Sequence, residues 1–513
     1  MRLRIRAALG VVSVGLLITL SASTLTSTPA ASAAPVAGAP GVGDPYYPFA
    51  GNGGYEVSHY DIRLTYQPAT DQLSGTTTIL ATTTEELSSF DLDFGLHTNS
   101  VLVNSVPAAF HVDPAENGEL VVTPDAPLAA HQPITVVVNY ADTPSKVVID
   151  GVTAWIKTPD GALAVNEPQI SQWWFPSNDH PTDKATYDIA VQVPDNVAAL
   201  STGTLVRTTK TRAGWTWWNW RSTQPANTYA MTLEVGAFQV NRATTPDGKP
   251  FVTAYDPAAG DSLDAAKASV ERTPEIDAFL ASQFGPYPFE AEGGVVTRPV
   301  LGFALEAQTR PVYDSRFFAA GSNTTVIAHE NAHQWFGDAV SLGRWSDIWL
   351  NEAFATYGEY LWSEHEGEGT AAELAQFGYD SHPAEDPFWQ VLPGDPGVAK
   401  QFDSAVYDRG VLGLQALRTT VGDDAFFTIL RTWVAEHKGG SARINDFIAL
   451  SERISGKPLQ ELFTTWLFTL GKPAAGPNGP GAAAIRPANA GVAPKSYAQI
   501  EATHQLLATA HQR

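Results

Sequence analysis

The chain has 513 residues, and its 44% of hydrophobic and 17% of charged residues are typical of a globular protein with a buried core. Acidic residues outnumber basic ones by 54 to 31, a net charge of −23, so we expect no nucleic-acid partner. The chain has no cysteine, which excludes disulfides, thiolate metal sites and cysteine nucleophiles.

The first 33 residues have the pattern of a secretory signal peptide. Arg2, Arg4 and Arg6 precede an apolar stretch, Ala7–Leu20, that is too short to span a bilayer. Ala31-Ser32-Ala33 then supplies the small residues that a signal peptidase requires. We therefore expect a secreted, extracellular protein without a membrane anchor.

From Tyr55 to about Arg242 the sequence predicts β-strands. Branched, aromatic and alternating residues fill Tyr55–Tyr66, Leu73–Thr84 and Ile134–Tyr140, and Gly, Pro, Asn and Asp separate these runs. This pattern favours antiparallel sheets with tight turns.

After Pro250 the periodicity becomes that of helices. Asp261–Phe284 predicts one helix, and most of the chain between Thr324 and Leu470 predicts further helices. Ala, Gly and Pro then dominate, so residues 472–513 are predicted to form a flexible tail in which His504 and His511 are exposed to solvent.

The sequence His329-Glu330-Asn331-Ala332-His333 matches the H-E-x-x-H pattern within a predicted helix. Histidines four residues apart share one helix face, so both imidazoles can reach one metal ion. Glu330 lies about 100° around the helix from His329, beside the metal, where a general base for water belongs.

Eighteen residues separate His333 from Glu352, which lies in a second predicted helix. Two histidines and a glutamate leave one position of a zinc tetrahedron open for water, as in catalytic sites. Such an ion lowers the pKa of its water to about 7, which makes hydroxide accessible at neutral pH. A chance occurrence of the pattern is the alternative, and the helical context and the position of Glu352 argue against it.

Three further segments match family motifs: Asn178-Asp179-His180-Pro181 followed by Lys184-Ala185-Thr186, Leu350-Asn351-Glu352-Ala353-Phe354-Ala355, and Val406-Tyr407-Asp408-Arg409-Gly410. Together with H-E-x-x-H they resemble, in order, the signatures of the aminopeptidase N family of gluzincin zinc metallopeptidases, which also includes leukotriene hydrolase. The resemblance covers residues 45 to about 470.

The resemblance implies an N-terminal antiparallel β-sandwich saddle over residues 45–243 and a mostly helical, thermolysin-like catalytic domain over residues 244–471. It also implies that His329, His333 and Glu352 bind one Zn²⁺ per chain and that Glu330 is the general base. Tyr407 would donate a hydrogen bond to the oxyanion of the tetrahedral intermediate.

The family motif that contacts the substrate amine is usually glycine-x-methionine-glutamate-asparagine, and here the segment is Phe303-Ala304-Leu305-Glu306-Ala307. Only Glu306, which would bind the free α-amine, is retained. Glu167 falls near the position of a second residue that contacts the substrate amine in the family. An equally good interpretation is that Glu167 is simply an acidic residue on the surface. The chain resembles a short form without the C-terminal helical domain of larger relatives.

The leading interpretation is a secreted, monomeric zinc aminopeptidase that removes N-terminal residues from peptides with a free N-terminus. A secreted thermolysin-like endopeptidase is the alternative, because it would use the same metal ligands. Glu306 and the β-rich N-terminal half argue against it. A non-catalytic binding protein on the same scaffold is a third, weaker possibility.

Overall fold

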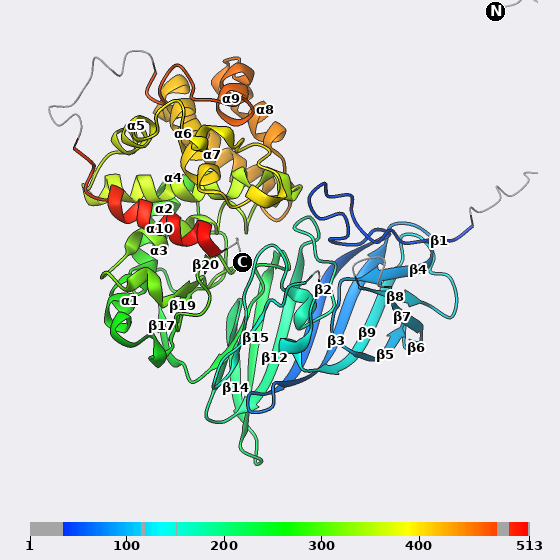
Figure 1. Ribbon diagram of the computed structural model, residues 1–513. Helices are drawn as coiled ribbons and strands as arrows, with labels where there is room; N and C mark the ends of the chain where they lie inside the picture. The colour runs from blue at the N-terminus through cyan, green and yellow to red at the C-terminus, as the bar shows by residue number, and fades with distance from the viewer. Residues whose placement is uncertain (1–33, 114–117, 150, 480–491, 511–513) are drawn as a thin grey trace, which may run out of the picture. The chain divides into compact units, whose positions relative to one another are not determined.

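The computed structural model describes residues 34–113, 118–149, 151–479 and 492–510 (Figure 1). The predicted signal peptide, residues 1–33, and His511 lie outside the described residues. Within the described part of the chain, no helix is both long and apolar enough to cross a membrane.

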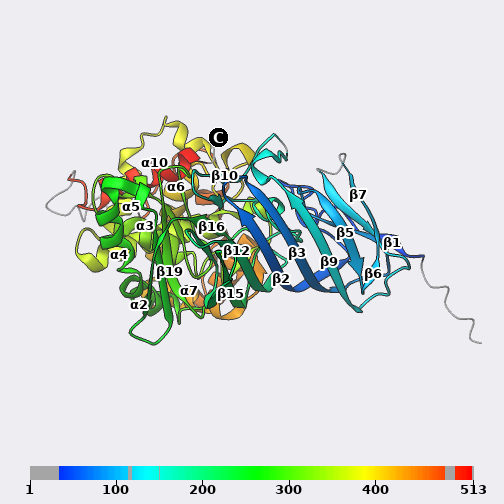
Figure 2. The ribbon, with the colours of Figure 1, turned by 90° about the horizontal axis from the view of Figure 1, so that it is seen from below.

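The largest sheet of the N-terminal domain has eight strands among the described residues, in the order β14-β15-β12-β2-β3-β9-β5-β6 (Figure 2). Neighbouring strands are antiparallel except for the parallel pair β12 and β2. The three strands named from the sequence are present as β2, β3 and β9. The bounds are β2 (Tyr55–Gln67), β3 (Gln72–Thr83), β5 (Thr98–Val103), β6 (Val106–Pro107), β9 (Pro133–Asp142), β12 (Ala185–Pro194), β14 (Thr204–Lys210) and β15 (Trp215–Ala226).

Two smaller sheets pack on one face of this large sheet. Side chains along β2 are buried and exposed in turn, because successive residues point to opposite faces. On the buried face, Tyr55 contacts Phe90 and Tyr66 contacts Trp155, which come from the two smaller sheets. The predicted β-rich N-terminal domain is thus a sandwich. The smaller sheets consist of β1 (Val36–Ala37), β4 (Leu87–Leu92), β8 (Glu119–Thr123) and β7 (Ala109–Asp113), and of β10 (Trp155–Lys157), β11 (Ala162–Ala164), β16 (Leu233–Gly236) and β13 (Ala198–Ser201).

The second domain continues as helices, as predicted, but it begins with a mixed sheet that was not predicted from the sequence. Its sheet order is β17-β18-β19-β21-β20. Because β17 pairs with β18, the boundary predicted after residue 243 falls inside a strand of this domain. The bounds are β17 (Gln239–Thr244), β18 (Pro250–Tyr255), β19 (Glu292–Thr297), β20 (Ala304–Leu305), β21 (Val312–Asp314), β22 (Ser341–Leu342) and β23 (Ser441–Ala442). The helices are α1 (Leu263–Val270), α2 (Thr273–Phe284), α3 (Thr324–Ala332), α4 (Trp349–Glu366), α5 (Ala371–Ser381), α6 (Ser404–Val421), α7 (Asp423–His437), α8 (Ile444–Ser455), α9 (Gln460–Leu467) and α10 (Tyr497–Ala510).

Two helix predictions need correction. The single helix expected over Asp261–Phe284 is two helices, α1 and α2, because Pro274 lacks an N–H donor and belongs to the first turn of a new helix. The flexible tail expected over residues 472–513 is wrong for Tyr497–Ala510, which form α10. Ile500 and Leu507, spaced at helical intervals, are buried against the domain, and this apolar face holds the segment in place.

Long side chains connect the two domains through backbone carbonyls. Lys184, from the predicted family motif, donates to the carbonyls of Asp338 and Ala339. In the opposite direction, the buried guanidinium of Arg310 donates to the carbonyls of Ser201 and Gly203 in the N-terminal domain. These contacts fix the loops around α3 against the β-sandwich.

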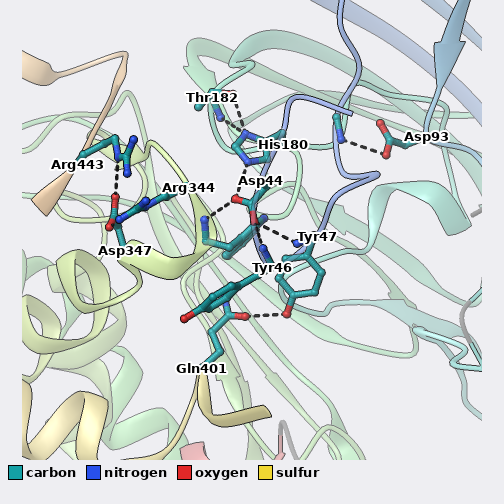
Figure 3. A network of polar contacts seen from close by, with 12 residues as sticks. Asp44, Tyr46, Tyr47, Asp93, His180, Thr182, Arg344, Asp347, Gln401 and Arg443 are labelled. Atoms are coloured by element: carbon teal, nitrogen blue, oxygen red, sulfur yellow. Dashed lines mark hydrogen bonds and ion pairs between the residues drawn. The ribbon is translucent and has the colours of Figure 1, made fainter. Parts of the chain in front are cut away.

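A short N-terminal arm, residues 44–47, also contacts both domains (Figure 3). The buried carboxylate of Asp44 accepts a hydrogen bond of 2.7 Å from the Trp345 N–H and lies 3.2 Å from Nε2 of His180. The Tyr47 hydroxyl donates to Oε1 of Gln401 at 2.7 Å. Burial raises the pKa of Asp44, but the hydrogen bonds from His180 and the backbone outweigh burial, so the pKa lies below 3.8.

Replacing Asp44 with Ala should lower the free energy of unfolding by about 1–3 kcal/mol, because buried donors lose their acceptor. The pKa of Asp44 is lower in the folded chain, so this contribution is complete at neutral pH and diminishes as the pH falls below about 4. Urea unfolding of Asp44→Ala, with the exposed Asp125→Ala as control, measures both effects. If Asp44→Ala had the same free energy of unfolding as the wild type at pH 7, the stabilising role of Asp44 would be wrong.

Candidate metal centre

Helix α3 presents the H-E-x-x-H residues in a buried position. Its N-cap is Asn323, whose side-chain oxygen accepts hydrogen bonds from the N–H groups of Thr325 and Val326 and so fixes where the helix starts. From this start, His329 and Glu330 fall in the last turns and His333 is the C-cap. Both histidines are at most 2% exposed.

Helix α4 brings Glu352 to the two histidines. Its Oε2 lies 3.5 Å from Nε2 of His329 and 3.6 Å from Nε2 of His333, and the three candidate ligand atoms all lie within 4.8 Å of one another. Two imidazole nitrogens and one carboxylate oxygen are the donor set of a catalytic zinc site. The residues therefore fit Zn²⁺, and the three predicted ligands do come together.

Nδ1 of each histidine, the ring nitrogen not directed at Glu352, also has a polar partner. Nδ1 of His329 lies 2.5 Å from Oε1 of Glu359, and Nδ1 of His333 lies 3.0 Å from the carbonyl of Phe336. Such contacts stabilise a proton on Nδ1, so a bound metal ion would take the Nε2 position of each ring. The sequence interpretation missed Glu359, although it lies seven residues, two helical turns, after Glu352 and so on the same face of α4.

The charge of Glu352 suits a metal ligand. Burial alone would raise its pKa, but the neighbouring charge of His333 and hydrogen bonds with both histidines lower it to about 2. The side chain is therefore a carboxylate at neutral pH.

Glu330 lies beside the cluster and not within it. It is 1% exposed, and among the described residues no group forms a hydrogen bond with its Oε1. Burial raises the pKa of Glu330 to about 8, while the neighbouring His329 and His333 act in the opposite direction. A buried carboxyl with one unoccupied oxygen can exchange a proton with a molecule that enters the site.

Two further carboxylates, Glu306 and Glu167, lie near the cluster. A ligand atom of Glu306 lies within 4.8 Å of those of Glu330 and His333, and its Oε1 accepts a hydrogen bond of 3.0 Å from the hydroxyl of Tyr229. Glu167 is only 5% exposed, so its interpretation as a surface acid is wrong. Burial, and next the charge of Glu306, raise the pKa of Glu167 well above its usual value.

Tyr407 reaches the cluster from α6. Its ring stacks on His329 with centroids 5.9 Å apart and planes 26° from parallel, and it is 2% exposed. The structure thus brings Tyr407 beside a candidate metal ligand, as the resemblance implied.

The prediction that His504 is exposed to solvent is wrong. It is 1% exposed, and its Nε2 lies 2.8 Å from Glu359 while its Nδ1 lies 2.7 Å from Asp408. Burial lowers the pKa of His504, but the two carboxylates outweigh burial and raise the pKa well above its usual value. The spacing of Ile500, Thr503 and Leu507 was the available signal for a buried helix face here.

The chain also matches known protein families in both of its domains. Residues 56–230 match the Peptidase M1 N-terminal domain, and residues 307–466 match the Peptidase family M1 domain. The chain belongs to peptidase family M1.

Among curated relatives, glutamyl aminopeptidase from Bitis rhinoceros is 26% identical over 337 residues, which is 61% of this chain and 34% of that protein. Aminopeptidase M1 from Arabidopsis thaliana is 27% identical over 333 residues, 61% of this chain and 37% of that protein. The chain thus spans little more than a third of the length of the curated relatives it matches.

A solved structure covers more of the chain. The M1 zinc metallopeptidase from Deinococcus radiodurans is 28% identical, with a TM-score of 0.74 over 84% of this chain and 99% of that one. A mutant of that enzyme bound to a Tyr-Ser-Ala substrate has the same TM-score at 29% identity.

We expect His333→Ala to lose zinc, because one of three protein ligands disappears from the cluster. Elemental analysis of the purified chain should give one zinc per wild-type molecule and almost none in the variant. His97→Ala, at an exposed histidine, is the matched control and should retain its zinc. Full zinc content in His333→Ala would contradict the assignment.

Proposed function

We propose that the protein is a secreted zinc aminopeptidase that hydrolyses the first peptide bond of peptides with a free N-terminus. The observation that carries this proposal is the pair of buried carboxylates, Glu306 and Glu167, beside the histidine and glutamate cluster. Membership of peptidase family M1 and relatives named as aminopeptidases support it. Secretion rests on the pattern of residues 1–33.

In this proposal His329, His333 and Glu352 hold the zinc ion. When bound there, zinc acts as a Lewis acid that polarises a carbonyl and makes water more acidic. Glu359 and the Phe336 carbonyl keep the imidazole rings oriented toward the ion.

Glu330 and Tyr407 supply the proton transfer and the charge stabilisation. Glu330 accepts a proton from the attacking water and delivers it to the nitrogen of the leaving amine. The Tyr407 hydroxyl, held by ring stacking on His329, donates a hydrogen bond to the oxyanion that develops on the former carbonyl.

Glu306 and Glu167 give the site its preference for a free amine. Buried carboxylates are costly unless a cation pairs with them, and the ammonium group of a peptide is such a cation. Tyr229 donates to Glu306 and holds it in place. Because a ligand atom of Glu306 lies within 4.8 Å of one of His333, an ammonium bound there would bring the first peptide bond to the metal ligands.

The endopeptidase alternative uses the same metal ligands and the same base, but it gives no role to Glu306 and Glu167. The non-catalytic alternative gives no role to Glu330, whose Oε1 has no hydrogen-bond partner among the described residues. Both are therefore the weaker explanations of this site.

The test of the aminopeptidase proposal compares a peptide with a free amine and the same peptide after N-acetylation. Acetylation removes the charge that pairs with Glu306, so kcat/KM should fall at least about 10²-fold. Glu306→Gln keeps the shape without the charge and should remove most of this discrimination by slowing the free peptide. Equal cleavage of both peptides by the wild type would favour the endopeptidase.

Glu330→Gln should separate metal binding from proton transfer. The amide cannot accept the proton of water, so kcat should fall about 10²- to 10⁴-fold while zinc content stays at the wild-type level. Steady-state kinetics and elemental analysis on one preparation measure both. A near-normal kcat would mean that another group acts as the base.

A further inference from the structure

The last described helix, α10, packs against the helix that carries the metal cluster (Figure 1). Asn323, the N-cap of α3, donates from Nδ2 to Oγ1 of Thr503 at 3.0 Å. Gln499 accepts from the hydroxyl of Thr325 at 3.2 Å and donates to the carbonyl of Ser322 at 3.0 Å. Specific hydrogen bonds thus fix α10 at the start of α3.

In this position α10 places His504 next to Glu359, on the side of His329 that faces away from Glu352. Both of its ring nitrogens face carboxylates, Nε2 toward Glu359 at 2.8 Å and Nδ1 toward Asp408 at 2.7 Å. An imidazole that donates to two carboxylates is protonated at both nitrogens. His504 is therefore a buried cation between two acids.

One oxygen of Glu359 connects this cation to the cluster. Oε1 lies 2.5 Å from Nδ1 of His329 and 2.8 Å from Nε2 of His504. Glu359 is 1% exposed, and among the described residues its Oε2 has no hydrogen-bond partner. Without His504 this buried carboxylate oxygen would lose one of its two hydrogen-bond partners, and its orientation toward His329 would change.

The ring of His504 also lies near Tyr407. The two ring centroids are 5.8 Å apart, and Asp408, which contacts His504, is the next residue after Tyr407. His504 of α10 therefore contacts Glu359, the hydrogen-bond partner of a candidate ligand, and its ring lies near that of the candidate oxyanion donor.

We propose that His504 is a positioning residue of the metal centre, which acts through Glu359 on His329. Helix α10 is then part of the metal site although it comes from a distant part of the chain. This inference rests on the proposed role of His329 as a zinc ligand.

The test is a double-mutant cycle on zinc affinity, measured in the full chain by competition with a chelating dye. His504→Ala should weaken zinc binding about 10- to 100-fold, as loss of an outer contact of a metal ligand does. Glu359→Gln should weaken it similarly. In the double variant the two effects should not add, because His504 acts through Glu359.

Gln499→Ala is the matched control, because it removes contacts of α10 with α3 but none with Glu359. It should bind zinc as the wild type does. His504→Gln, which keeps bulk and one donor, gives a second reading if His504→Ala does not fold, and its affinity should lie between wild type and Glu359→Gln.

Unchanged zinc affinity in a folded His504 variant would overturn the proposal, as would additive effects in the cycle or an equal loss in Gln499→Ala. Zinc affinity is measured without peptide. Failure of the aminopeptidase assay and failure of this inference are therefore separate results.

Discussion

Buried carboxylates that need cations to balance them are the constraint on which this site depends. Glu352 and Glu359 are paired with histidines, whereas Glu167, Glu306 and Glu330 lie together with raised pKa values. A cluster of this kind is costly in an unliganded protein and favours cationic ligands. In the proposed function, the zinc ion and the substrate ammonium are those ligands. In this proposal, one charge arrangement accounts for both zinc binding and the preference for a free N-terminus.

The two domains share this arrangement, which explains why their contacts are specific. Tyr229 and Glu167 come from the N-terminal domain, whereas Glu306 and the metal cluster come from the helical domain. A shift of one domain against the other would separate Tyr229 and Glu167 from Glu306 and the metal cluster. The hydrogen bonds of Lys184 and Arg310 to carbonyls of the opposite domain oppose such a shift.

Features set by local periodicity were predictable from the sequence. His329, Glu330 and His333 lie at fixed helical spacings in α3, and Glu352 follows at the offset of the family motif. Glu359 lies two helical turns after Glu352 in α4 and could have been found from that spacing. The burial of Glu167 and the docking of His504 depend on contacts between residues more than a hundred positions apart, and no short pattern encodes those. Because Ala, Gly and Pro dominate the segment before α10, the predicted flexible tail was extended over Tyr497–Ala510 and the apolar face of this helix was not recognised.

Zinc-edge anomalous diffraction from crystals of the wild-type chain tests the central claim most directly. The account predicts one peak about 2.0–2.2 Å from Nε2 of His329, Nε2 of His333 and a carboxylate oxygen of Glu352. A peak at Glu359 and His504, or one without Glu352 as a ligand, would contradict it.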